Sequence, residues 1–138
     1  MKYLVLLARI LFSAIFFMSA FSHFSAGTIA YAASQGVPFP GFLVPAAGIL
    51  ALAGAISIII GFKARWGALA IILFLVPVTV MMHNFWAVSD PMMHQMQMIM
   101  FMKNLSMLGG AILIAYFGSG PLSFDGNNDC CCDKKEEA

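Results

Sequence analysis

The sequence predicts an all-α membrane protein, a bundle of four transmembrane helices with both chain termini in the cytoplasm. Of the 138 residues, 62% are apolar and only 9% are charged, and the mean hydropathy is +0.92. A water-soluble domain has about half apolar and about a quarter charged residues. Four apolar stretches, each near the roughly 20 residues that a spanning helix needs, fill most of the chain. The chain is therefore predicted to be embedded in the lipid bilayer, which is its first expected partner.

The first span is expected at about residues 3–24, directly after Lys2. We expect it to be retained and not cleaved as a secretory signal, because the apolar stretch is too long for a signal core and contains Arg9. The following residues, up to about 42, are rich in glycine and proline. They predict a loop with room for one short surface helix.

The second and third spans are expected at about residues 43–62 and 66–83. Pro45 lies in the first turn of the second span, where a missing backbone N–H costs little. The connection between these two spans is very tight. They are therefore predicted to be antiparallel neighbours.

The fourth span is expected at about residues 98–117, in a helix that begins before the apolar layer. Ser89 or Asp90 provides an N-cap for this helix, and Pro91 suits its first turn. The glycines and proline that follow residue 117 terminate it. Residues 1–124 thus form one predicted membrane domain.

Residues 125–138 are predicted to be a disordered cytoplasmic tail that contains three consecutive cysteines, Cys130, Cys131 and Cys132. We expect these thiols to be reduced in the cytoplasm. Their spacing does not match that of a structural zinc site. The sequence leaves their role open.

The orientation is predicted from the lysines and arginines of the short loops, which stay on the cytoplasmic side of a membrane. These residues all fall on one side of the four-span arrangement, and the two opposite loops contain none. The residues concerned are Lys2, Lys63, Arg65, Lys134 and Lys135. The net charge of +1 gives no reason to expect nucleic acid as a partner.

Several short motifs occur together along the chain. The most specific is His83-Asn84-Phe85-Trp86, and the others are Arg9-Ile10-Leu11, Gly36-Val37-Pro38, Gly61-Phe62-Lys63-Ala64-Arg65, Lys103-Asn104-Leu105 with Gly109-Gly110, and Gly118 to Asp125. With these motifs the chain resembles the DoxX family of small bacterial membrane proteins over about residues 5–125.

The resemblance implies a multi-pass protein of the bacterial inner (plasma) membrane that is associated with redox complexes. It also implies an association with oxidative-stress assemblies. In related proteins, sulfur compounds are oxidised and the electrons pass to quinone. The chain departs from the family pattern at two positions. It has Ala51 where the family often has a glutamate, and His23 where the family tends to have a lysine.

Polar side chains gather on the predicted outer side of the membrane, and they predict a polar pocket in the outer leaflet. They include His23, His83, Asn84, Lys103 and Asn104. Imidazole and ammonium donors beside apolar walls suit the carbonyls of a quinone head group. A quinone is therefore the candidate cofactor. For any single histidine, an ordinary interfacial residue is the simpler interpretation.

Two cations inside the spans need a partner. Arg9 either extends toward the cytoplasmic head groups or has a buried role, and both interpretations stay open. Lys103 either reaches Asp90, or titrates or binds an anionic or carbonyl-bearing ligand. We expect Lys103 to face the bundle interior beside Asn104, within reach of His83.

Methionine is abundant toward the fourth span, and this favours a second function. Thioethers and imidazoles are soft ligands that suit Cu(I), and the candidates at helical spacing are His94, Met96, Met98 and Met100. Methionine is also a common apolar filler. Copper handling or transport is therefore an alternative.

The sequence contains no catalytic triad, no paired carboxylates and no haem or flavin motif, so it predicts no self-contained active site. We expect a membrane subunit of an oxidoreductase assembly, homo-oligomeric, with the redox chemistry in bound quinone or in a soluble partner protein. A structural membrane anchor for a soluble enzyme is the third interpretation.

Overall fold

The computed structural model describes residues 2–125, and in this part of the chain four long helices carry the apolar stretches. They are α1 (Lys2–Ser22), α3 (Pro40–Ile60), α4 (Ala64–Met82) and α5 (Pro91–Phe117). Each is long and apolar enough to cross a bilayer. The predicted all-α fold with four membrane spans is confirmed.

Two short elements lie in the connections between the long helices. α2 (Ala26–Ser34) follows α1, and the 3-10 turn η1 (Phe85–Ala87) follows α4. α2 is the short helix for which the loop had room, and its N-cap is Ser25, whose hydroxyl accepts a hydrogen bond from the backbone N–H of Thr28 at 3.2 Å. The sequence did not predict η1.

Local chemistry explains where the long helices begin and end. α3 begins at Pro40, earlier than predicted, because this proline itself occupies the first turn. At the start of α5 the carboxylate of Asp90, and not Ser89, caps the helix by accepting from the N–H of Met93 at 2.8 Å. Gly61 ends α3 in the left-handed region, at φ 73°.

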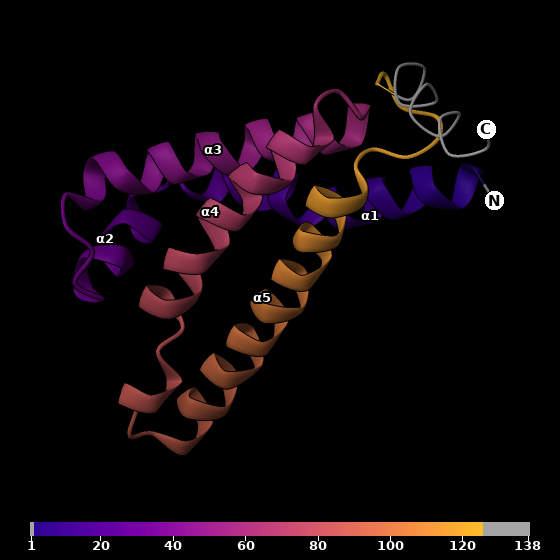
Figure 1. The fold of residues 1–138 in the computed structure, drawn as a ribbon. Helices are drawn as coiled ribbons and strands as arrows, with labels where there is room; N and C mark the ends of the chain where they lie inside the picture. The colour runs from indigo at the N-terminus through magenta and orange to yellow at the C-terminus, as the bar shows by residue number, and fades with distance from the viewer. Residues whose placement is uncertain (1, 126–138) are drawn as a thin grey trace, which may run out of the picture.

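The helices form a wedge that opens away from the chain ends. α3 packs against α1 and α4, and α4 also packs against α5. Figure 1 shows the pair α1 and α3 diverging from the pair α4 and α5 toward α2 and η1. We call the end that holds Lys2 and Asp125 the terminal end, and the end that holds α2 and η1 the loop end.

The core lies where the helices converge, and small residues allow the close approach. Phe16 of α1 meets Phe74 of α4 edge to face, with ring centroids 6.4 Å apart. Ile58 and Ile71 are fully buried beside several alanines. By contrast, α5 buries only Asn104 and Ala111.

Candidate ligand-binding cavity

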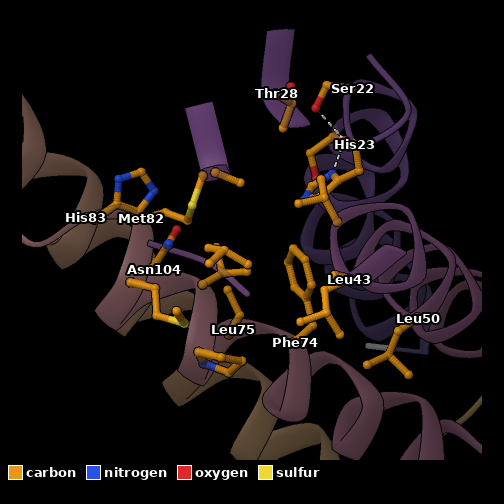
Figure 2. A pocket seen from close by; sticks show the side chains of 18 of the residues that line it. Ser22, His23, Thr28, Leu43, Leu50, Phe74, Leu75, Met82, His83 and Asn104 are labelled. Carbon is orange, nitrogen blue, oxygen red and sulfur yellow. Dashed lines mark hydrogen bonds between the residues drawn. The ribbon is translucent and has the colours of Figure 1, made fainter. Parts of the chain in front are cut away.

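A cavity of about 850 Å³ lies at the loop end, between the diverging helix pairs. Its walls are mostly apolar and include Leu43 and Leu50 of α3 and Phe74 and Leu75 of α4. Figure 2 shows these side chains around the open space. The volume is in the range of small-molecule sites, roughly 300–1,000 Å³.

Four of the polar residues singled out from the sequence line this one cavity: His23, His83, Lys103 and Asn104. His23 follows α1, His83 caps the end of α4, and the other two lie on α5. Residues that are far apart in the sequence therefore meet because three helices end or pass at the same depth of the bundle.

His23 is held in place through one ring nitrogen. Its Nδ1 lies 2.8 Å from the carbonyl oxygen of Ser19, one helical turn earlier. The ring also packs edge-on against Phe74, with centroids 5.4 Å apart. A carbonyl can only accept a hydrogen bond. The Nδ1 of His23 therefore carries the proton, and Nε2 makes no hydrogen bond within residues 2–125.

His83 is held by a chain of hydrogen bonds that crosses three elements. Its Nδ1 lies 2.8 Å from Oε1 of Gln97 on α5. Nε2 of Gln97 donates to the hydroxyl of Tyr31 on α2 at 2.9 Å. That hydroxyl donates to the backbone carbonyl of Met82 on α4 at 3.4 Å. This chain ties α2 and α5 to the end of α4.

Asn104 and Lys103 stand side by side on α5 but differ in exposure. Asn104 is only 5% exposed, and Figure 2 shows its amide pointing toward Met82 and His83. Lys103 lines the cavity yet is exposed, and its ammonium donates to the sulfur of Met100 at 3.3 Å. Lys103 is thus at the rim of the cavity, less enclosed than the expected interior position, while Asn104 is part of its wall.

The other two candidate site residues lie elsewhere. Asn84 follows His83 directly and precedes η1, but it does not line the cavity. Arg9 lies at the terminal end, where it is 3% exposed. Its guanidinium donates to the backbone carbonyls of Ser119 at 2.9 Å and of Leu122 at 2.6 Å. Arg9 therefore has a buried position, and it does not extend to head groups.

The copper candidates do not gather around the cavity. The ring of His94 packs edge-on against Phe85, with centroids 5.6 Å apart. Met96 and Met98 are exposed on the surface of α5, and the sulfur of Met100 accepts from Lys103. Nothing in the described residues tests copper binding by these side chains, so it stays a prediction.

Sequence reasoning missed Tyr31, which joins Gln97 to the end of α4. Tyr31 lies on α2, in the stretch predicted as a loop. A signal was present, because a tyrosine with a polar tip on an apolar body is typical of the membrane interface. Its partners, however, depend on where α2, which packs against α3, lies relative to the ends of α4 and α5.

Comparisons with known proteins place the chain among small inner membrane proteins. The DoxX family model matches residues 4–84. The inner membrane protein YphA of Escherichia coli (strain K12) is 33% identical over 124 residues, which are 88% of each chain. The inner membrane protein YqjF of the same strain is 34% identical over 123 residues, again 88% of each chain. No solved structure matches the chain.

Proposed function

We propose, from the premise that this chain belongs to the DoxX family, that it binds a quinone head group in the loop-end cavity as the membrane subunit of a redox assembly. The chain is a multi-pass protein of the inner membrane, like the relatives that it matches. The proposal concerns what the cavity holds and which process it serves.

One observation carries this proposal: polar side chains from three helices converge on a single apolar cavity within the membrane-spanning bundle. A quinone has a flat polar ring and a long hydrocarbon tail. Phe16 and Phe74 supply aromatic surface for the ring, and Lys103 and Asn104 carry N–H donors for its oxygens. The tail can remain in lipid or along the apolar wall.

In this role the residues of the chain bind and orient the head group, and they do not transfer electrons themselves. The quinone carries the electrons when it is bound, and a soluble partner protein exchanges them with it. The function of this chain is therefore to present a membrane-soluble carrier to that partner at a fixed position.

A binding experiment with a cavity-filling variant tests the proposal. Ala47 of α3 lines the cavity, and Ala53 of the same helix is exposed away from it. The protein in lipid nanodiscs should bind decylubiquinone saturably. Ala47→Phe should weaken this binding at least about tenfold, because the added ring occupies the space of the ligand, whereas Ala53→Phe should bind as the wild type does.

Two results of this experiment would contradict the proposal. If the wild type shows no saturable binding, or if Ala47→Phe and Ala53→Phe bind alike, the quinone proposal is wrong. Analysis of what copurifies from a gentle detergent separates the alternatives. A bound quinone supports the proposal, and stoichiometric copper without quinone favours the metal-handling alternative.

A further inference from the structure

We propose that the cavity prefers the reduced, hydroxyl-bearing form of its ligand, a quinol, over the oxidised quinone. This inference rests on the proposed function, and it deepens it by naming the redox state that the site recognises. The directions of the hydrogen bonds around the two histidines of the cavity support it.

A chain of hydrogen bonds fixes the proton position on His83. The carbonyl of Met82 can only accept, so the Tyr31 hydroxyl donates to it. The oxygen of that hydroxyl therefore accepts from the amide N–H of Gln97. The other end of this amide is then its carbonyl oxygen, which accepts from Nδ1–H of His83. Neutral His83 is thereby left with an unprotonated Nε2.

A single hydrogen bond fixes the proton position on His23 in the same way. Its Nδ1 faces the backbone carbonyl of Ser19 at 2.8 Å and must donate to it. Its Nε2 is then also an acceptor. Both histidines line the cavity. In the neutral state the only ring nitrogen that each has left for a ligand is Nε2, which carries a lone pair and no proton.

The oxidised and reduced forms of the ligand differ in what they offer to these lone pairs. A quinone carbonyl only accepts hydrogen bonds, so it can pair with Lys103 or Asn104 at the cavity but leaves the Nε2 lone pair beside it unpaired. A quinol hydroxyl donates to Nε2, and its oxygen can still accept from Lys103 or Asn104 at the same cavity. Leaving one desolvated acceptor unpaired costs enough to lower affinity on the order of tenfold.

The affinities of the two forms give the direct test. Decylubiquinol and decylubiquinone are titrated anaerobically into the wild type in nanodiscs, at about pH 8, where an ordinary imidazole is neutral. The quinol should bind about tenfold more tightly. Equal affinity, or tighter binding of the quinone, overturns the inference.

A pair of histidine variants identifies the residue responsible. His83→Leu should lower the ratio of quinol affinity to quinone affinity about tenfold, because only the quinol donates to this ring. A merely structural role would weaken the binding of both forms equally and leave this ratio unchanged. His94→Leu is the matched control, since His94 lies outside the cavity, and it should change neither affinity. If His83→Leu weakens both forms alike, the assignment is wrong.

The proton position can also be measured without any ligand. The ¹⁵N chemical shifts of His83 should report the Nδ1–H tautomer in the wild type. Gln97→Leu removes the acceptor of that proton, so it should mix the tautomers and reduce the preference for quinol. An Nε2–H tautomer in the wild type overturns the inference.

Failure of the inference can be distinguished from failure of the proposed function. If both forms bind equally and Ala47→Phe abolishes both, the site stands and the preference is refuted. If neither form binds saturably, the proposed function fails and the preference fails with it.

Discussion

At the residue scale, Arg9 shows how a charge inside an apolar helix can be stabilised without an acidic partner. The last carbonyls of a helix and of the turn after it have no partner within the helix. The guanidinium of Arg9 donates to two such carbonyls, those of Ser119 and Leu122, just beyond the end of α5. It thereby fastens the segment after α5 to the first half of α1.

Replacement of Arg9 should therefore destabilise the protein. Arg9→Met removes both hydrogen bonds, and each bond from a charged donor contributes about 1.5–3 kcal/mol. Arg9→Lys can restore one of them at most, so its stability should be intermediate. Thermal unfolding in detergent measures both changes. Arg65→Met removes an exposed cation at the same end of the bundle, and it serves as the control. An Arg9→Met variant as stable as this control would contradict the assignment.

Lys103 is the second residue whose role can be tested alone. It lines the rim of the cavity, and its flexible stem lets the ammonium reach a head-group oxygen. Lys103→Met should abolish quinone binding while insertion and stability are kept, because methionine preserves the apolar bulk. Saturable binding in nanodiscs is the measurement. Lys63→Met, at the terminal end, should bind normally, and full binding by Lys103→Met would remove Lys103 from the site.

At the element scale, the approach of α3 to α4 depends on glycines that face each other. A Cβ added at Gly54 would lie 2.8 Å from the carbonyl oxygen of Gly67, and one added at Gly67 would lie 2.7 Å from Cβ of Ser57. These contacts involve backbone or the root of a side chain, so the helices would have to separate. Small residues that permit close helix packing are typical of membrane proteins.

Gly54→Ala should consequently destabilise the bundle by about 1–3 kcal/mol, the usual cost of overpacking. Gly109 of α5 provides a matched control, because a Cβ added there meets nothing within 4 Å. Gly109→Ala should be neutral or slightly stabilising, since alanine is the better helix former. Unfolding in mixed micelles compares the two variants. Equal stability of the two would show that the close contact carries no energy.

At the scale of the whole molecule, the four spans bring the first and last described residues to the same end of the bundle (Figure 1). The cations Lys2, Lys63 and Arg65 lie at this terminal end. The positive-inside rule then predicts that this end is cytoplasmic and that the cavity opens toward the outer leaflet.

Thiol labelling of intact cells tests this orientation. A membrane-impermeant reagent should leave Cys130, Cys131 and Cys132, which lie outside the described residues, unmodified until the cells are opened. In a variant with these cysteines replaced by serine, Ser34→Cys at the end of α2 should be labelled from the outer side. Reversal of the two results would invert the orientation and place the cavity in the inner leaflet.

The sequence by itself determined the four spans, the residues that begin and end the last helix, and the family. A helix crosses lipid because a local stretch is long and apolar enough to satisfy every backbone group internally. A cap such as Asp90 or a terminator such as Gly118 acts within a few residues. These are properties of neighbouring residues, so they can be read along the chain.

Only the tertiary structure decided which polar residues meet. The sequence grouped Arg9 with the histidines as a candidate site, yet Arg9 binds backbone carbonyls at the terminal end while His23 and His83 line the cavity. The proton positions on the two rings depend on partners as distant as Tyr31. Helix rotation, crossing angle and the position of α2 set these contacts, and they result from packing across the whole bundle, which no local pattern encodes.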